Sequence, residues 1–251
     1  MEVTILGSGA SLPSPDRVLA GVMVETGGEA LIFDIGAGVL HRLTVSLPDM
    51  NRIEHVFITH FHVDHCSDLA ALLQTLWLMG YGKTLHVYGP KHVEKAYKGL
   101  EMIFPYLMDK VHLKLQVVNA KFRKESRNWT VTAFPVKHGD IESYGYAIDA
   151  EGKRVVYSGD TAPCRELVQA AKGADLLIHE CSLPDQFKDK APHHTTPTEL
   201  GVLAAEAGVR TLVLTHLYPE LIDELANALS CIRRTFSGKV VVPRDTQIIT
   251  L

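Results

Sequence analysis

The ten residues from Thr59 to Asp68 most constrain what this chain can fold into. They read T-H-F-H-V-D-H-C-S-D, so histidines and an aspartate recur with the spacing H-x-H-x-D-H. Imidazole nitrogens and carboxylate oxygens are ligands of divalent metal ions. The apolar residues 56–58 predict a buried strand before the cluster, and residues 69–73 predict a helix after it. The cluster therefore lies in a strand-to-helix turn that can hold metal ions, and a solvated polar loop is the alternative interpretation.

Length and composition favour one α/β domain that covers residues 1–251. A chain of this size buries roughly 70–75% of its unfolded surface, so it needs no disulfides to be stable. Its four cysteines are far apart and form no C-x-x-C motif, which is typical of free thiols in a reducing compartment. The chain has no leader-like N-terminus and no apolar run near the ~20 residues of a membrane span. We therefore expect a cytoplasmic protein without a membrane partner.

Five predicted apolar strands each end in a residue that can bind metal. The five are Asp34, His60, Asp160, His179 and His216. In layered α/β proteins, sites form beyond the carboxyl ends of strands, so these ends are expected to converge. A single histidine after a strand is more often structural, and we interpret His179 in that way. The pattern recurs before and after about residue 140, which predicts two similar sheet-and-helix halves packed face to face.

Three further segments have patterns specific enough to test. Residues 121–127 contain four basic side chains and predict a loop. Thr196 to Glu199 reads T-P-T-E, the pattern of a helix N-terminal capping box with proline at the first helical position. Leucines and isoleucines at helical spacing predict one continuous helix over 221–232.

The complete set of polar strand ends resembles a known family. The residues His60, His62, Asp64, His65, His138, Asp160 and His216 resemble the seven ligands of the metallo-β-lactamase superfamily. Within it, the chain is most similar to the ribonuclease Z branch and its phosphodiesterase and arylsulfatase-like relatives. The motifs that carry this similarity are L-G-S-G at 6–9, F-D-I-G at 33–36, S-Y-G-Y at 143–146, S-G-D-T at 158–161, H-E at 179–180 and H-T-T at 194–196. The resemblance implies a four-layer αββα sandwich over the whole chain.

The resemblance also implies a cofactor, which is a pair of divalent metal ions. Zinc is expected, and the ligand types are also compatible with manganese or iron. One ion would be held by His60, His62 and His138, and the other by Asp64, His65 and His216, with Asp160 bridging the two. Such a pair can activate a bridging hydroxide that attacks phosphorus. Asp64 would also orient that hydroxide, which makes it a catalytic residue as well as a ligand.

Two more catalytic residues are implied by the same resemblance. His194 would protonate the leaving oxygen, and Glu180 would orient His194. The neighbouring His193 is expected to have no role. Asp34 either fixes the tautomer of a ligand histidine or is a turn residue at the end of its strand, and the sequence leaves both interpretations open.

The chain departs from the ribonuclease Z pattern in three places. His138 and Asp160 are only 22 positions apart, which leaves no room for the long arm that grips tRNA in that family. The early basic loop of the family survives only as Pro15 and Arg17, and Ala37 stands where the family has an acidic residue between two glycines. These departures and the net charge of −4 favour a small phosphodiester or an RNA 3′ end as substrate.

Four other hypotheses remain open at this stage. The protein could be a true tRNA 3′-processing endonuclease despite the missing arm. It could be an arylsulfatase-like enzyme or a lactonase that uses the same metal pair. It could also be a non-catalytic interaction protein, although the complete ligand set argues against a decayed site. A homodimer is a further expectation, because an exposed apolar face of such a sandwich often pairs with a second copy.

Overall fold

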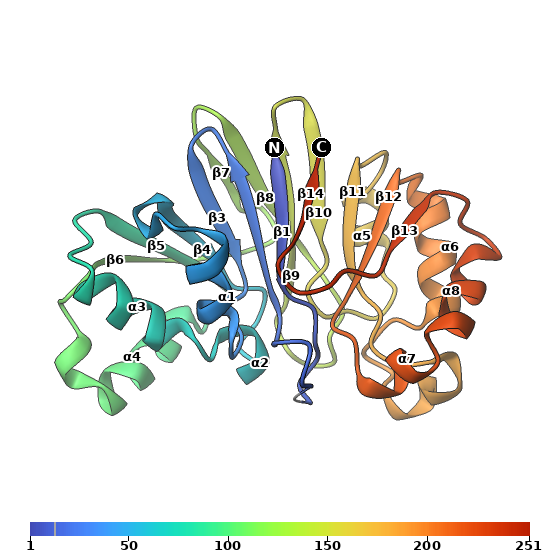
Figure 1. Cartoon of the computed structure of the whole chain (residues 1–251), viewed down its shortest axis with the longest axis horizontal. Helices are drawn as coiled ribbons and strands as arrows, with labels where there is room; N and C mark the ends of the chain where they lie inside the picture. The colour runs from blue at the N-terminus through green and yellow to red at the C-terminus, as the bar shows by residue number, and fades with distance from the viewer. Residues whose placement is uncertain (13) are drawn as a thin grey trace.

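The computed structural model describes residues 1–12 and 14–251 as two β-sheets packed face to face between two groups of helices (Figure 1). The first sheet contains β1 (Glu2–Gly7), β2 (Gly21–Thr26), β3 (Glu29–Phe33), β4 (Ile53–Phe57), β5 (Thr84–Gly89), β6 (His112–Val117) and β14 (Gln247–Thr250). The second contains β7 (Arg123–Glu125), β8 (Trp129–Pro135), β9 (Tyr144–Ala150), β10 (Lys153–Tyr157), β11 (Leu176–Glu180), β12 (Thr211–Thr215) and β13 (Lys239–Val241). This arrangement confirms the predicted αββα sandwich.

The helices cover the outer faces of the two sheets (Figure 1). Beside the first sheet lie α1 (Val39–Ser46), α2 (Val63–Cys66), α3 (Leu69–Leu78) and α4 (Val93–Ile103). Beside the second lie α5 (Arg165–Ala170), α6 (Pro197–Ala207), α7 (Pro219–Asp223) and α8 (Leu225–Arg233). Short 3-10 helices cover Met50–Arg52, Pro105–Leu107 and Asp185–Lys190. No helix in the described part of the chain is long and apolar enough to cross a membrane.

Strand alternation explains why both sheets are buried on both faces. In β3, Ala30 and Ile32 pack toward the helices, whereas Leu31 and Phe33 pack between the sheets. In β12 the central Val213 likewise lies in the core between the sheets, and its two neighbours face the helices. Successive side chains of a strand point to opposite faces, so strands covered on both sides must be continuously apolar. The apolar runs in the sequence are therefore a direct consequence of the layered architecture.

The strands that precede the candidate site run parallel to one another. Strands β3, β4, β5 and β6 form one parallel set, and β10, β11, β12 and β13 form another. Their carboxyl ends reach the same edge of the sandwich, at the bottom of Figure 1. This edge brings together loops from both sheets, as the strand-end pattern predicts.

Three details of the predicted elements are wrong. The chain passes from the first sheet to the second between β6 and β7, near residue 120 rather than 140, and β14 returns to pair with β1. The basic segment 121–127 contains the edge strand β7, which pairs with β8. The predicted helix over 221–232 is broken at Glu224 into α7 and α8. The capping box is confirmed, because the Glu199 carboxylate accepts a hydrogen bond from the Thr196 backbone N–H at 3.0 Å.

Candidate metal centre

The H-x-H-x-D-H cluster follows β4 and begins α2. His60 and His62 lie in the connecting loop, and Asp64 and His65 lie on the short helix itself. The backbone of this helix packs against Gly36, where a Cβ atom would lie only 2.0 Å from the Asp64 carbonyl oxygen. Only glycine permits that approach. The G-A-G segment after β3 therefore sets the position of the histidine cluster.

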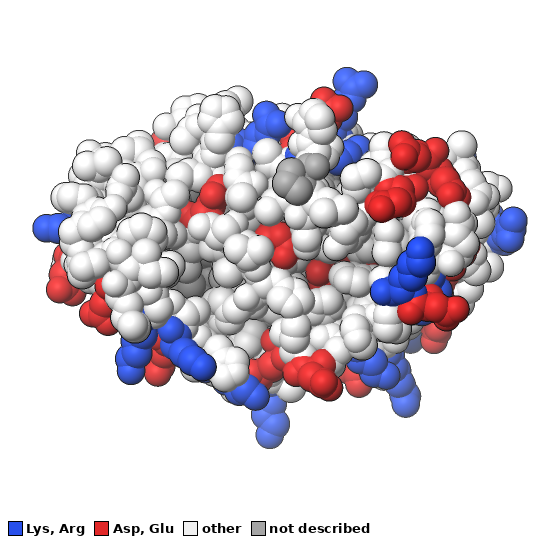
Figure 2. Space-filling model, turned by 90° about the horizontal axis from the view of Figure 1, so that it is seen from below, with Lys and Arg blue, Asp and Glu red and all other residues white. Residues whose placement is uncertain are grey.

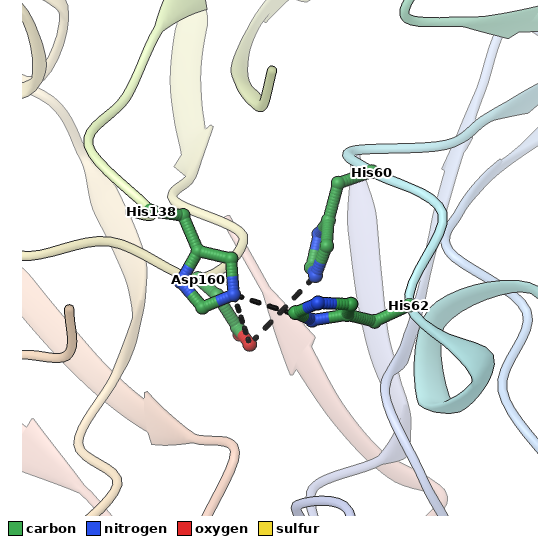
Figure 3. Close-up of side chains that lie close together, drawn as sticks. All are labelled: His60, His62, His138 and Asp160. Atoms are coloured by element: carbon green, nitrogen blue, oxygen red, sulfur yellow. Dashed lines mark hydrogen bonds and ion pairs between the residues drawn. The ribbon is translucent and has the colours of Figure 1, made fainter. Parts of the chain in front are cut away.

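One group of four side chains converges from both sheets (Figure 3). His60 and His62 come from the loop after β4, His138 follows β8, and Asp160 follows β10. The ring nitrogens His138 Nε2 and His62 Nδ1 are 3.3 Å apart. Asp160 Oδ2 lies 3.9 Å from His138 Nε2 and 4.0 Å from His60 Nε2. These four atoms surround one small volume.

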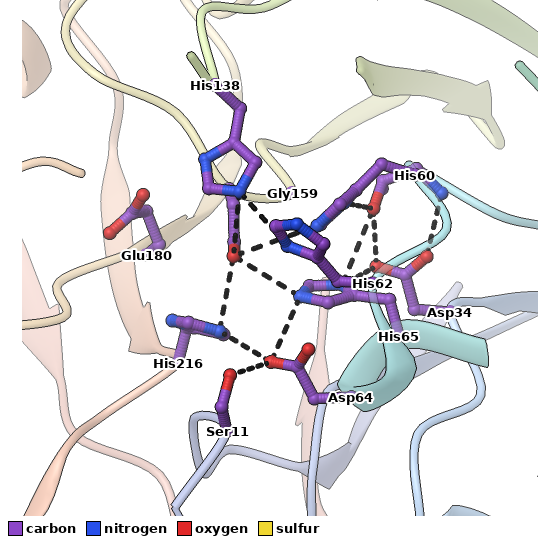
Figure 4. A network of polar contacts seen from close by, with 12 residues as sticks. Ser11, Asp34, His60, His62, Asp64, His65, His138, Gly159, Glu180 and His216 are labelled. Carbon is purple, nitrogen blue, oxygen red and sulfur yellow. Dashed lines mark hydrogen bonds and ion pairs between the residues drawn. The ribbon is translucent and has the colours of Figure 1, made fainter. Parts of the chain in front are cut away.

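A second group of four shares Asp160 with the first. Figure 4 labels its other members, Asp64, His65 and His216. His216, which follows β12, places Nε2 3.1 Å from Asp64 Oδ2 and 3.3 Å from Asp160 Oδ2. His65 Nε2 lies 3.6 Å from Asp64 Oδ2 and 3.4 Å from Asp160 Oδ2. The same oxygen of Asp160 is thus a member of both groups. All seven predicted ligands are brought together by the fold.

The spacing of these donor atoms fits divalent ions. Two atoms that each lie about 2.1 Å from one tetrahedral ion are about 3.4 Å apart, close to the 3.1–3.6 Å separations in the second group. His60 Nε2, His65 Nε2 and Asp160 Oδ1 are buried and have no hydrogen-bond partner among the described residues. Buried polar atoms are normally satisfied. Two ions at these positions would satisfy the two ring nitrogens.

Metal binding requires ionised carboxylates and neutral imidazoles, and the carboxylates of the site meet this requirement whereas its histidines differ from one another. Burial raises the pKa of Asp160, but the charges of His216 and His65 outweigh it and hold the pKa well below its usual range. Burial also raises the pKa of Asp64, but hydrogen bonding and charge from His216 exceed it, so that pKa is lowered as well. Burial lowers the pKa of His60. His65 differs, since burial lowers its pKa but the neighbouring carboxylates Asp160 and Asp34 outweigh burial and raise it.

Asp34 is held at the end of β3 beneath the cluster. Its Oδ2 accepts hydrogen bonds from His65 Nδ1 at 2.7 Å and from Tyr157 Oη at 2.9 Å. Thr59 donates to Oδ2 through its hydroxyl at 2.9 Å and to Oδ1 through its backbone N–H at 2.8 Å. Asp34 is fully buried and has a positive φ of 57°. The sequence left open whether Asp34 fixes the tautomer of a histidine or is a turn residue. The geometry supports the first interpretation, because the hydrogen bond at Nδ1 of His65 leaves Nε2 directed toward the second group.

Glu180 and His194 form a hydrogen-bonded pair beside the second group. Glu180 ends β11 and is fully buried, and its Oε1 accepts a hydrogen bond from His194 Nδ1 at 2.9 Å. Ser182 lies between His194 and His216. Its hydroxyl is 3.2 Å from His194 Nδ1 and 2.9 Å from His216 Nδ1. Burial disfavours charge on His194, but the hydrogen bond and charge of Glu180 outweigh it and raise the pKa of His194 to about 9. The imidazole is therefore protonated at neutral pH.

Two hydroxyl residues of the site were not predicted from the sequence. Ser11 donates to Asp64 Oδ2 at 2.7 Å, and Ser182 donates to the Glu180 carboxylate at 2.5 Å. Isolated serines in loops have no distinguishing pattern, although Ser182 lies only two residues after Glu180. His193 is exposed and lies beside Gly139, and His179 is buried and has its Nδ1 2.6 Å from the backbone carbonyl of Glu180.

Comparison with known proteins places this chain in a family. Residues 29–217 match the model of the beta-lactamase superfamily domain. The ribonuclease Z of Mycobacterium bovis is 30% identical, with 98% of this chain and 96% of that protein covered. The ribonuclease Z of Pyrococcus horikoshii is 29% identical, with 100% of this chain and 96% of that protein covered. That alignment spans 302 positions, more than the 251 residues of this chain, so the relative carries insertions.

Two solved structures agree with the sequence relatives. The metallo-beta-lactamase fold protein YhfI of Bacillus subtilis is 26% identical, with a TM-score of 0.85 over 99% of this chain and 98% of that one. The short form of human tRNase Z is 28% identical, with a TM-score of 0.82 over 100% of this chain and 99% of that one. The sheets, their order and the histidine motif thus have a common explanation: the chain belongs to the metallo-β-lactamase superfamily, in its ribonuclease Z-like branch.

Proposed function

We propose that the protein is a metal-dependent hydrolase that cleaves phosphodiesters at a two-metal centre. The observation that carries this proposal is the sharing of Asp160 Oδ2 by two groups of donor atoms, beside the hydrogen-bonded pair of Glu180 and His194. A pair of divalent ions, when bound, supplies an activated water as nucleophile and neutralises charge on the phosphate. The relatives named ribonuclease Z support this reaction type.

We propose zinc as the metal and the seven residues above as its ligands. His60, His62 and His138 would hold one ion, Asp64, His65 and His216 the other, and Asp160 both. Imidazole with few carboxylates favours zinc over harder ions such as magnesium. Asp64 is also proposed to orient the nucleophile, and Ser11 holds its carboxylate by donating to Oδ2 at 2.7 Å.

His194 is proposed as the general acid and Glu180 as the residue that positions it. With Nδ1 bound to Glu180, the other nitrogen of His194 can give its proton to a leaving oxygen. The rings of His194 and His216 are stacked with their centroids 5.5 Å apart, so the acid lies directly beside a proposed metal ligand. A positioned acid of this kind typically contributes ~10²–10⁴-fold to the rate.

The substrate is proposed to be a small phosphodiester or an RNA 3′ end. Residues 138–160, all described, are occupied mainly by the hairpin of β9 and β10, and they form no protruding arm. On the face that carries the site, Lys and Arg side chains lie mostly near the margins, and the centre has few of them (Figure 2). Gripping a long RNA requires many phosphate contacts. Precursor tRNA remains a second candidate, because the chain is 28% identical to a human tRNase Z.

A substrate panel with a salt series tests these proposals. Zinc-loaded protein would be assayed on a phosphodiester, a phosphomonoester, an aryl sulfate, a lactone and a precursor tRNA. We expect turnover of the phosphodiester and a shallow dependence on salt, since few phosphates are contacted. Preferred hydrolysis of the sulfate or lactone would overturn the phosphodiesterase proposal. Efficient tRNA processing at physiological salt would replace the small substrate with the second candidate.

We also propose that the chain works as one domain and as a homodimer in the cytoplasm. All four cysteines lie in the described part of the chain as free thiols, which suits a reducing compartment.

Large apolar side chains are exposed near the ends of α3 and α4, among them Leu78, Met102 and Ile103 at 68%, 85% and 67% exposure. Exposed apolar clusters commonly mark interfaces. Light scattering of the wild type and of Met102→Lys tests this: a dimer that dissociates in the variant is expected, and a monomeric wild type would contradict it.

A further inference from the structure

A small pocket of about 340 Å³ lies immediately beside the candidate acid His194. Its walls come from segments that follow different strands, and Leu12, Leu183, Pro192 and Tyr218 give it an apolar side. Two charged residues, Lys190 and Glu220, also line it. Leu12 is 50% exposed, although it lies at the edge of a site otherwise built from polar groups. The volume is near the lower limit of the ~300–1,000 Å³ typical of small-molecule pockets. A single ring system is the kind of group that such a pocket can enclose.

Tyr218 connects the pocket to the metal centre. Its ring lies 5.8 Å from the His216 ring, centroid to centroid, at an interplanar angle of 73°. Its backbone N–H donates to the Ser182 carbonyl at 3.3 Å, and Pro219 begins α7 directly after it. The tyrosine is partly exposed. The backbone is therefore fixed while part of the ring remains available to a ligand.

The position of His194 decides which part of a substrate enters this pocket. Nδ1 of His194 is held by Glu180 at 2.9 Å, so the proton that it donates must come from Nε2. The leaving oxygen must then lie near Nε2. Because His194 itself lines the pocket, the group attached to the leaving oxygen extends on the pocket side, and the retained phosphate stays over the metal ligands.

We propose that this pocket binds a planar aromatic ring carried by the leaving alcohol, with the ring packed against Tyr218. This inference rests on the proposed function. In the reaction, the oxygen of water forms a bond to phosphorus and the bond from phosphorus to the leaving oxygen breaks. The leaving oxygen keeps that electron pair and takes the proton of His194. The proton lost by the water restores the charge of His194 in the next step. A nucleoside base is one ring of the required size and shape.

A diester with two different alcohols provides the test. In ethyl 2-phenylethyl phosphate, both alcohols are alkyl leaving groups of similar basicity, so the ratio of released alcohols reports binding orientation. The wild type is expected to release 2-phenylethanol in preference to ethanol. Removing an aromatic stacking partner typically changes binding by about 10- to 100-fold, so Tyr218→Ala should reduce the ratio by about that factor. Tyr218→Phe keeps the ring and should keep the ratio.

The ratio is an internal measure, because both products come from the same active molecules. Tyr106→Ala removes an exposed tyrosine of a distant 3-10 helix and serves as the matched control, with an unchanged ratio expected. A second readout needs no metal: saturation-transfer NMR should detect 2-phenylethanol on the metal-free wild type and not on Tyr218→Ala.

The outcomes separate the inference from the function on which it rests. Hydrolysis with equal release of both alcohols, or a ratio that Tyr218→Ala leaves unchanged, overturns the pocket and leaves the phosphodiesterase intact. If a 2-cyclohexylethyl group is preferred as strongly as the 2-phenylethyl group, the pocket accepts any apolar group. That result overturns the proposed specificity for a planar aromatic ring. No hydrolysis of any phosphodiester by metal-loaded protein overturns the proposed function, and this inference with it.

Discussion

Asp34→Asn is the substitution that most directly tests how the structure holds the metal ligands. Asp34 lies in left-handed backbone with φ of 57°. Asparagine tolerates this conformation better than other side chains do, and it has the same shape as aspartate. The substitution therefore removes charge and one acceptor without disturbing the backbone. Any change in metal affinity then comes from the hydrogen bonds.

The contacts of Asp34 set the size of the effect. Three donors meet Oδ2, at 2.9 Å from Thr59 Oγ1, 2.7 Å from His65 Nδ1 and 2.9 Å from Tyr157 Oη. In the variant, the amide oxygen would occupy the place of Oδ2, so the amide NH₂ group would face the Thr59 backbone N–H. A buried donor left unsatisfied costs about 1–3 kcal/mol, and each charge-assisted bond weakens by about 1 kcal/mol when its acceptor becomes neutral. We expect the free energy of unfolding to fall by roughly 4–6 kcal/mol, from one unsatisfied donor and three weakened bonds.

The effect on metal binding is separate from the effect on stability. Loss of the carboxylate partner of a ligand histidine typically weakens metal affinity by about 10–100-fold. Zinc affinity would be measured by competition with a chromophoric chelator, and stability by denaturant unfolding of the metal-free protein. Asp175→Asn is the control, because Asp175 accepts a hydrogen bond from the Arg154 N–H at 3.0 Å at the opposite edge of the sheet. A zinc affinity within about twofold of the wild type in Asp34→Asn would refute the reasoning.

Three further outcomes are expected. His194→Ala should lower turnover of an alkyl phosphodiester by ~10²–10⁴-fold with unchanged metal content. The loss should be smaller on a p-nitrophenyl ester, because its phenolate needs little protonation to leave. Equal losses on both substrates would show that His194 is not the general acid. Protein purified without chelator should contain close to two metal equivalents by elemental analysis, and Asp160→Ala should lose more metal than His138→Ala, because Asp160 Oδ2 belongs to both groups. Burial and the charge of His86 lower the pKa of His55 to about 4 in the folded protein. The unfolded chain therefore binds a proton at this residue more readily than the folded protein does, and the free energy of unfolding falls as pH drops from ~6.5 toward 4. His55→Gln should reduce that loss by roughly 2 kcal/mol in denaturant titrations at about pH 6.5 and 4.5, and an unchanged loss would contradict this origin.

The convergence of polar strand ends on one edge could be predicted from the sequence because two regularities coincide, whereas the assignment of seven residues as metal ligands was implied by the family resemblance. Strands buried on both faces must be apolar, so each polar residue at a strand end is conspicuous. Parallel strands also end at one edge, so residues such as Asp34 and His216 could be brought together without knowing the loops between them. The fold class followed from the same pattern, together with the family resemblance of the histidine motif.

Features that depend on loop paths could not be predicted in this way. Ser11, Ser182 and Tyr218 lie in loops of the site, and their residue types do not distinguish them from solvated loop residues, although Ser182 and Tyr218 each follow a predicted site residue by two positions. The return of β14 to the first sheet depends on pairing between the two ends of the chain, which local patterns do not encode. The break at Glu224 also has no local signal, since the apolar spacing continues across it.

The two sheets contribute different parts of the centre, and this has a consequence for stability. The first sheet supplies the cluster after β4 and the supporting Asp34, whereas His138, Asp160 and His216 come from the second. Neither half can hold both ions alone, so metal binding requires that the sheets be packed. A ligand that binds only the folded state stabilises it by about 4 kcal/mol at about 1,000 times its Kd. The metal pair would therefore link the two sheets. When both ions are bound, the two halves would unfold together as one cooperative unit.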